Sequence, residues 1–429
     1  MAPMTPDSTA ALLLKGYAWL PDLRRRSGDG ALVRIRLLGR PAVVLHGPGA
    51  VAFFYDARHV RRHGALPGPV LDTLFGRGAV HTLDGEEHRV RKALFLGELT
   101  EPAAVAELVD RVRAEWQRAF APPHDREVVL FDEAALVLAR AVCAWTGLAL
   151  TERQIVRMAR DCVAMVDGFA TPGPRHLRAR RARSRQEEVL ARLVEAARGG
   201  AAHAPGTPFD AVVRHRDADG TPLDARTAAV ELLNIVRPTV AIAWYLVFAA
   251  HAMDRRPGQR QLLREDTSPL AGPYPEAYAA SHAELFAHEV RRFYPFVPFV
   301  GGLAAADLRR DGQEIAEGTL LLLDVYGRNH DPELWHEPYR FDPERFLRRA
   351  PLPDELIPQG GGRAENGHRC PGEDITVAVL AALATELARL EYTVPEQDLG
   401  IPLHRIPTRP RSGFRFVPHP SFRGPERPV

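Results

Sequence analysis

One cysteine near the carboxyl end of the chain stands in a setting that suits metal chemistry. Cys370 is preceded by a glycine run that includes Gly361 and Gly362, and it is followed by Pro371 and Glu373. Proline and acidic residues favour the first turn of a helix, where the peptide dipoles stabilise a thiolate. Because glycine has no side chain, a flat and bulky group can approach such a run closely. The stretch therefore fits an axial haem ligand, and a buried structural cysteine is the alternative.

A second candidate group lies in the most apolar segment of the chain. Asp224 is typical of a helix N-cap, and the apolar pattern predicts a long helix from there to about Met253. In its middle, Pro238 removes a backbone hydrogen bond, which costs ~3 kcal/mol, and Arg237 adds the cost of burying a charge. An anionic ligand is the simplest compensating partner, because a guanidinium binds a carboxylate through two parallel hydrogen bonds. The alternative is an arginine satisfied by carbonyls that are freed at the proline kink.

A histidine and a lysine further toward the amino terminus form a third candidate group. His88 and Lys92 are four residues apart, so a helix places both on one face, where they could reach the carboxylates of a haem. Of the 56 basic residues only Lys15 and Lys92 are lysines, which makes Lys92 stand out against an arginine-rich background. An exposed helix face with solvated charges is the alternative.

One carboxylate and two guanidinium groups are expected to pair in the interior. Glu289 and Arg292 lie on or beside the apolar face of a predicted helix, where charges are costly unless they are paired. Arg345, in a later Phe-Asp-Pro-Glu-Arg-Phe segment, is the candidate third member of this cluster. An ordinary ion pair on a helix surface is the alternative.

Three motifs in this order resemble those of the cytochrome P-450 superfamily. They are the Glu-x-x-Arg motif of Glu289 and Arg292, the Pro-Glu-Arg-Phe segment that contains Arg345, and the Cys-x-Gly loop that begins at Cys370. The resemblance implies a mainly α protein with the cytochrome P-450 fold, a large helical domain with small β-sheets. It implies haem b as the cofactor, with Cys370 as the axial thiolate and metal ligand. The other three residues would then form a structural triad and take no part in catalysis.

The same resemblance implies which residues contact the cofactor. His368, two residues before the cysteine, resembles the propionate contact that the family carries in this loop. His88 and Lys92 would contact the haem carboxylates from their helix. Gly361 and Gly362 belong to the loop that would lie against the cofactor.

The substrate side departs from most of the superfamily. Monooxygenase members usually carry an acid followed by threonine where this chain has Arg237 and Pro238. This pair resembles the fatty-acid peroxygenase branch, which includes alkene-forming fatty-acid decarboxylases, and the glycine run 360–362 also looks like that branch. By resemblance His81 lies in the distal pocket, where members of the branch carry His or Gln, and Phe75 can pack against it. A histidine satisfied by a loop carbonyl is the alternative for His81.

The resemblance implies a specific reaction. Arg237 would hold a fatty-acid carboxylate, and the bound carboxylate would act as the general acid–base that splits hydrogen peroxide. The prediction is a haem-thiolate peroxygenase that oxidises long-chain fatty acids at the α and β carbons, by hydroxylation and by oxidative decarboxylation to terminal alkenes. Redox partner proteins are then not required. Two alternatives stay open: a dioxygen-dependent monooxygenase fed by redox partners, and a non-catalytic haem or fatty-acid binding protein.

Length and composition narrow the class of protein. The 429 residues show no linker or repeat, so one haem domain over 1–429 is expected. A formal net charge of +2 gives no reason to expect a nucleic-acid partner. Three scattered cysteines fit a reducing cytoplasm better than a disulfide framework. The longest apolar run, 239–250, is shorter than the ~20 residues that span a bilayer, and no signal peptide is visible, so we expect no membrane anchor.

Periodicity predicts the elements that must position these groups. Alternating apolar residues over 31–45 predict a hairpin, and strand patterns recur over 296–324 and 405–417. Apolar residues at intervals of three and four predict helices over the segments 50–59, 103–120, 131–148 and 151–166. After Cys370, a stripe of leucines predicts a buried helix.

Overall fold

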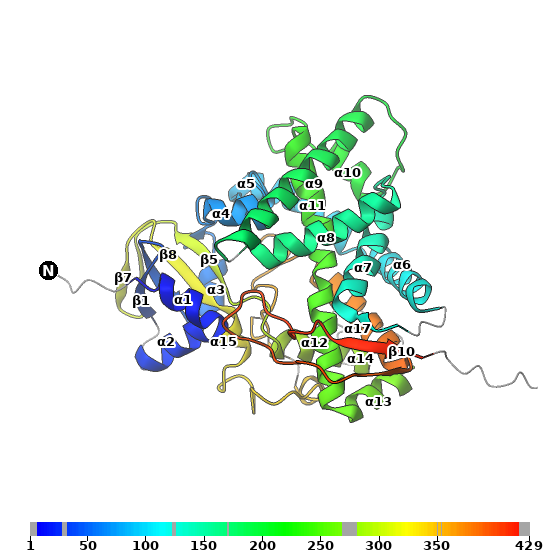
Figure 1. Cartoon of the computed structure of the whole chain (residues 1–429). Coiled ribbons are helices and arrows are strands. Elements are labelled where there is room, and N and C mark those ends of the chain that lie inside the picture. Colours follow the sequence, from blue (N-terminus) through cyan, green and yellow to red (C-terminus); the bar gives the residue numbers. More distant parts are fainter. Residues whose placement is uncertain are drawn as a thin grey trace, which may run out of the picture.

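The structure is a computed structural model that describes residues 7–27, 32–121, 126–169, 171–267, 281–349, 351–352 and 354–419. Over these residues helices predominate, and the largest sheet lies at one side of the molecule (Figure 1). The expected class, mainly α with small β-sheets, is confirmed.

Helices account for most of the elements along the chain. Those up to residue 214 are α1 (Thr9–Lys15), η1 (Gly16–Ala18), α2 (Trp19–Ser27), α3 (Ala50–Tyr55), α4 (Gly68–Val70), η2 (Leu71–Phe75), η3 (Val80–Thr82), α5 (Gly85–Leu99), α6 (Pro102–Phe120), α7 (Leu130–Trp145), α8 (Glu152–Gly168), α9 (Pro174–Arg198) and α10 (Pro208–Arg214). The later ones are α11 (Ala225–Val240), α12 (Ile242–Arg255), α13 (Pro257–Glu265), α14 (His282–Phe293), α15 (Val325–Asn329), α16 (Arg345–Arg348) and α17 (Glu373–Arg389).

The expected helices over 103–120, 131–148 and 151–166 are confirmed as α6, α7 and α8. The helix expected over 50–59 is shorter, because α3 ends at Tyr55. There the Asp56 carboxylate accepts a hydrogen bond from the backbone N–H of Arg58 at 2.9 Å, which turns the chain out of the helix.

Five strands form the main sheet in the order β1-β2-β8-β5-β3. They are β1 (Leu32–Leu37), β2 (Arg40–Leu45), β3 (Val60–Arg61), β5 (Phe299–Ala304) and β8 (Leu320–Asp324). The hairpin expected over 31–45 is confirmed, with Leu32 opposite Leu45. The pair β2 and β8 is parallel, and the other pairs in this sheet are antiparallel.

Two smaller sheets complete the strand content of the described residues. β6 (Leu308–Arg310) pairs with β7 (Gln313–Ile315), and β10 (Arg415–Pro418) lies between β4 (Val128–Val129) and β9 (Tyr392–Thr393). Of the strand signal over 405–417 only the last residues form a strand, since Pro407 and Pro410 have no N–H to donate to a ladder.

The helix pair α11 and α12 runs end to end through the middle of the molecule (Figure 1). The Asp224 carboxylate caps it as predicted, because it accepts hydrogen bonds from the N–H groups of Arg226 and Thr227 at 3.0 Å. The helix continues past Pro238 and is interrupted at Ala241. The span Ala225–Arg255 is long and apolar enough to cross a membrane, but 94% of its most apolar window is buried inside the protein, as in a core helix.

The largest apolar core surrounds this helix pair and includes side chains of α6, α7 and α17. The leucine stripe after Cys370 forms the predicted buried helix, α17, in which Leu380, Leu383 and Leu387 have no exposed surface. The core thereby fixes α17 and the loop before it against the long central helix pair.

Candidate active site

The Cys370 side chain lies in a loop that hydrogen bonds hold close to α17. The Cys370 N–H donates to the carbonyl oxygen of Gln359 at 3.2 Å, and the Gln359 Nε2 lies 3.9 Å from Sγ. Cys370 is half-buried, and desolvation raises the pKa of its thiol, while the Gly372 N–H and the charge of Lys92 act in the opposite direction. The sequence predicted that the helix end stabilises a thiolate, but the helix end alone does not outweigh the desolvation of the thiol. A bound cation such as iron supplies what a thiolate at this position needs.

The glycine run before Cys370 makes close contacts with α3. A Cβ on Gly361 would lie 2.2 Å from Cγ1 of Val51, and one on Gly362 would lie 2.9 Å from Cβ of Tyr55. Gly362 also has a φ of +70°, which side-chain-bearing residues rarely adopt. In the structure Gly361 thus lies against the side chain of Val51 and Gly362 against that of Tyr55, and a contact of either glycine with haem remains a prediction.

The three predicted propionate contacts lie together. The rings of His88 and His368 stack with centroids 3.9 Å apart, and the Lys92 Nζ donates to the carbonyl oxygen of Arg369 at 2.6 Å. Burial lowers the pKa of Lys92 to about 8, and of His88 to about 4, so both charged forms lack compensation. Two propionates would supply negative charge where it is missing.

The predicted residues of the substrate side also meet. The rings of Phe75 and His81 lie 4.6 Å apart, and the guanidinium carbon of Arg237 lies 5.9 Å from the Phe75 ring centre. Arg237 is 6% exposed, and Pro238 follows it on α11 with part of its surface accessible. Helix α11 and the segment from η2 to η3 thus bring Arg237 close to Phe75 and His81, which lie more than 150 residues earlier in the sequence.

The charge of Arg237 dominates the electrostatics of this side. Burial lowers the pKa of Arg237 to about 9, so the guanidinium is still protonated at neutral pH. Its Nε has no hydrogen-bond partner among the described residues, and the kink carbonyls that the sequence offered as an alternative do not satisfy it. Burial, and then the charge of Arg237, lower the pKa of His81 to about 3, so this imidazole is neutral. His81 Nδ1 also lacks a partner.

Sequence reasoning did not identify several residues that hold this arrangement. Asn234 accepts a hydrogen bond from Arg237 and donates one to the Phe75 carbonyl, which Arg183 also contacts. Glu231 pairs with Arg91. A polar residue at every third position of an otherwise apolar helix was the available signal.

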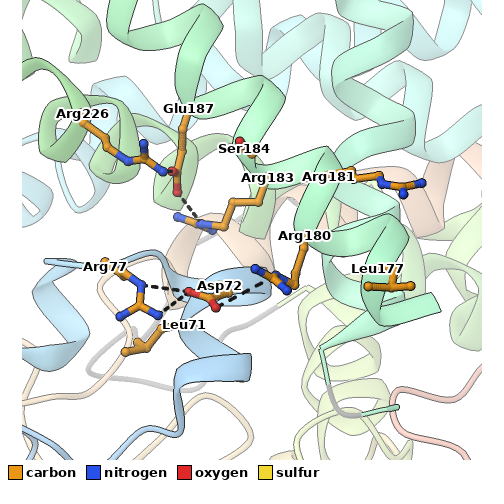
Figure 2. Close-up of a pocket in the computed structure, with 10 residues that line it drawn as sticks. All are labelled: Leu71, Asp72, Arg77, Leu177, Arg180, Arg181, Arg183, Ser184, Glu187 and Arg226. Carbon is orange, nitrogen blue, oxygen red and sulfur yellow. Dashed lines mark hydrogen bonds and ion pairs between the residues drawn. The ribbon is translucent and has the colours of Figure 1, made fainter. Parts of the chain in front are cut away.

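Arg183 also lines a surface crevice of about 370 Å³ between η2 and α9 (Figure 2). Figure 2 shows its ion pair with Glu187, and the pairing of Asp72 with Arg77 and Arg180. None of the predicted site residues lines this crevice. It is a separate, arginine-rich feature that borders the segment carrying Phe75.

The predicted cluster of Glu289, Arg292 and Arg345 is confirmed as a buried network. Arg292 donates to both carboxylate oxygens of Glu289, at 2.7 and 2.8 Å, and Arg345 Nε donates to Oε2 at 3.1 Å. Arg292 and Arg345 also donate to backbone carbonyls of the segment 329–340. The network joins α14 to that segment and serves the fold.

Comparison with known proteins agrees with this geometry. A sequence profile of the cytochrome P450 family matches residues 283–413, the part of the chain that holds the buried network and Cys370. The solved structure of cytochrome P450SP alpha (CYP152B1) with (R)-ibuprophen is 39% identical, covers 96% of this chain and 98% of that chain, and has a TM-score of 0.88. This chain belongs to the cytochrome P450 superfamily.

Two further solved structures place this P450 more closely. Wild-type cytochrome P450EX alpha (CYP152N1) with myristic acid is 35% identical, with 97% of this chain and 99% of that chain covered and a TM-score of 0.89. A variant of cytochrome P450 OleT with arachidonic acid is 34% identical, with 97% and 98% covered and a TM-score of 0.88. The predicted fatty-acid branch of the superfamily is confirmed by these matches.

Curated relatives match this P450 over less of their length. Cytochrome P450 4e5, mitochondrial, of Drosophila mettleri and cytochrome P450 4A11 of Homo sapiens are both 27% identical, over 192 and 191 residues. The matches span about a third of these relatives, 36% and 35% of their length. They support the assignment to the superfamily.

The residues present fit a haem with a cysteine thiolate, the cofactor of this superfamily. Among the residues that the structure describes, no three His, Cys, Asp or Glu side chains gather to hold a bare metal ion. Haem would need only a protein ligand such as the Cys370 thiolate for its iron, since the porphyrin itself supplies four nitrogen ligands. The thiol of Cys370, the poorly compensated charge of Lys92, and two orphaned polar nitrogens on the substrate side are compatible with that group.

Proposed function

We propose that this P450 is a haem-thiolate peroxygenase that uses hydrogen peroxide to oxidise long-chain fatty acids at the α and β carbons. Hydroxylation is accompanied by oxidative decarboxylation to terminal alkenes. In this proposal Cys370 would hold the haem iron, His88, Lys92 and His368 would bind the propionates, and Arg237 would bind the substrate carboxylate. Redox partner proteins are not required.

The buried charge of Arg237 is the observation that carries the proposal. A desolvated guanidinium with a free Nε is costly, and a carboxylate that accepts two parallel hydrogen bonds would remove that cost. Pro238 next to it has no hydroxyl and Arg237 has no acidic proton to relay at neutral pH. The chain thus provides at this point a carboxylate receptor in place of a proton relay.

The bound carboxylate then takes the role of an acid–base group. Haem, when bound through Cys370, supplies the oxidising chemistry, to which the thiolate contributes electron density. Arg237 holds the carboxylate with its α and β carbons directed toward the reaction centre. One carboxylate oxygen can accept a proton from hydrogen peroxide and return it to the departing oxygen. Proximity to Arg237 keeps that carboxylate ionised before the transfer.

His81 has a more limited role than a general acid. With a pKa of about 3 it is neutral in the working range, so it can donate one N–H hydrogen bond but has no extra proton to give. Its ring packs on Phe75 beside Arg237, where it would contact the carboxylate end of a substrate. We propose that it influences the ratio of hydroxylation to decarboxylation through that hydrogen bond.

Turnover with peroxide alone tests the proposal. Purified haem-loaded protein is mixed with a long-chain fatty acid and hydrogen peroxide without any reductase, and products are identified by mass spectrometry. We expect α- and β-hydroxy acids together with a terminal alkene one carbon shorter. Arg237→Ala should lose this activity and keep its haem absorption spectrum, whereas Arg192→Ala, an exposed arginine on α9, should behave as wild type.

Other outcomes would replace the proposal. Turnover only with NADPH and a ferredoxin system would make the protein a dioxygen-dependent monooxygenase. Fatty-acid binding without turnover under either condition would make it a binding protein.

A further inference from the structure

A ladder of polar side chains runs along one face of α11 and ends at Arg237. Glu231, Asn234 and Arg237 are three residues apart, a spacing that places them on one side of a helix. Their exposed fractions are 0%, 5% and 6%, so each must find its partners inside the protein.

Glu231 makes its hydrogen bonds to groups other than Arg237. Its Oε1 accepts hydrogen bonds from Arg91 Nη1 and from the backbone N–H of Val80, both at 2.8 Å. Its Oε2 accepts from Asn234 Nδ2 at 3.2 Å. Glu231 is thus paired with Arg91, which also pairs with Asp217, and it makes no direct hydrogen bond to the guanidinium of Arg237.

The orientation of the Asn234 amide follows from its neighbours. Its Nδ2 faces two acceptors, the Phe75 carbonyl oxygen at 3.0 Å and Glu231 Oε2. Its Oδ1 must then face Arg237, whose Nη2 donates to it at 3.2 Å. A flipped amide would set donor against donor and acceptor against acceptor at all three contacts.

The backbone on the other side of Asn234 is fixed as well. Arg183 donates from Nη1 to the Leu74 carbonyl at 2.7 Å and from Nη2 to the Phe75 carbonyl at 2.8 Å. Gly76 permits this approach, because a Cβ there would lie 2.2 Å from Arg183 Nη2. Asn234 thus joins a rigid piece of η2 to Arg237.

We propose that Asn234 is a positioning residue that anchors Arg237 through a neutral acceptor and thereby keeps its charge for a substrate carboxylate. An aspartate has nearly the same shape but would pair with Arg237 internally and compete with the substrate. Asparagine anchors the guanidinium without neutralising it, so a neutral side chain at position 234 preserves the preference of the site for carboxylates over uncharged head groups. This inference rests on the proposed function, in which Arg237 binds the carboxylate.

Binding of matched ligands to two variants tests the inference. The affinities of dodecanoic acid and 1-dodecanol for the haem-loaded protein are measured by titration calorimetry for wild type, Asn234→Asp and Asn234→Leu. We expect Asn234→Asp to weaken dodecanoic acid at least tenfold and to change 1-dodecanol less than twofold. A merely structural role would weaken both ligands equally, and that result, or unchanged affinity for the acid, overturns the inference.

Asn234→Leu separates the loss of the anchor from the addition of a negative charge, and it also tests the inference if Asn234→Asp does not fold. It removes the anchor but adds no negative charge, so the preference for the acid over the alcohol should persist. The ratio of α to β products should shift because Arg237 is no longer held. An unchanged product ratio and unchanged turnover contradict the anchoring role.

The experiment also separates this inference from the function on which it rests. If wild type prefers dodecanoic acid and Asn234→Asp keeps that preference, the inference alone fails. If wild type binds both ligands equally, Arg237 is not a carboxylate receptor and both fail.

Discussion

Replacing Arg237 by methionine should stabilise the substrate-free protein, although it removes the residue assigned to bind substrate. Lowering an arginine pKa to about 9 by burial disfavours the charged form by about 5 kcal/mol, at ~1.4 kcal/mol for each pKa unit. The unfolded chain binds this proton more tightly than the folded one. The free-energy cost of burying the charged guanidinium therefore applies in full below about pH 9. It decreases as the pH rises from there toward the ordinary arginine pKa.

The gain in the free energy of unfolding from Arg237→Met should be smaller than the full cost of burying the charge. Replacing buried charged groups by packed apolar ones typically gains ~1–4 kcal/mol, and methionine is flexible enough to fill the space. We expect the free energy of unfolding at pH 7 to rise by about 1–2 kcal/mol. The melting temperature should then rise by a few degrees, because each kcal/mol raises it by ~2–4 °C in domains of roughly 150–250 residues.

Calorimetric melting of haem-loaded protein, with and without a fatty acid, measures both effects. A ligand at 100 times its Kd stabilises the folded state by ~2.7 kcal/mol, so wild type should melt higher with fatty acid present. Arg237→Met should lose that response, and the exposed control Arg192→Met should keep it. A lower melting temperature for substrate-free Arg237→Met, or a retained response to fatty acid, would refute the reasoning.

Three further predictions concern the surrounding structure. Gly76→Ala should lower the free energy of unfolding, measured in urea, by ~1–3 kcal/mol, because φ at this position is +89° and the added Cβ would meet Arg183. The control Gly78→Ala should cost less, because φ there is +75° and the nearest atom to the added Cβ is 3.5 Å away. Glu289→Gln should cost ~3–5 kcal/mol and reduce the yield of haem-loaded protein, since two buried arginines lose their counter-charge; Glu86→Gln, at an exposed pair, should have little effect. The free energy of unfolding should fall as the pH is lowered from about 6.5 toward 4. Burial lowers the pKa of four of the histidines to about 3 or 4 in the folded state, so the unfolded chain takes up protons first. Those four are His81, His251, His288 and His330, and a urea midpoint that stays constant over this range would contradict the last prediction.

Residues that belong to ordered motifs were predictable from the sequence. Cys370 could be identified from its loop and from the helix that follows it. Glu289 and Arg292 could be identified because they are charged residues on an apolar helix face. The cost of Arg237 beside Pro238 could be read from the chain because both penalties are local. These predictions needed only neighbours in the sequence.

The supporting contacts could not be predicted, for a physical reason. Arg183 reaches backbone carbonyls more than a hundred positions earlier, and a carbonyl acceptor leaves no trace in the residue types. Asn234 lies in the segment that the sequence singled out, but the amide orientation depends on Glu231 and on the Phe75 carbonyl. The packing of the glycine run against Val51 and Tyr55 of α3, some three hundred residues away, left no signal in the sequence either.

The Phe75 carbonyl oxygen receives hydrogen bonds from both α9 and α11, while the Phe75 ring faces Arg237 and His81. The hydrogen bonds that anchor α9 and α11 to this residue are thus accepted by its main chain, whereas its side chain determines the shape of the pocket. Natural variation or a mutant library at position 75 can therefore remodel the pocket without releasing the guanidinium from its support. The two properties can evolve separately at a single residue.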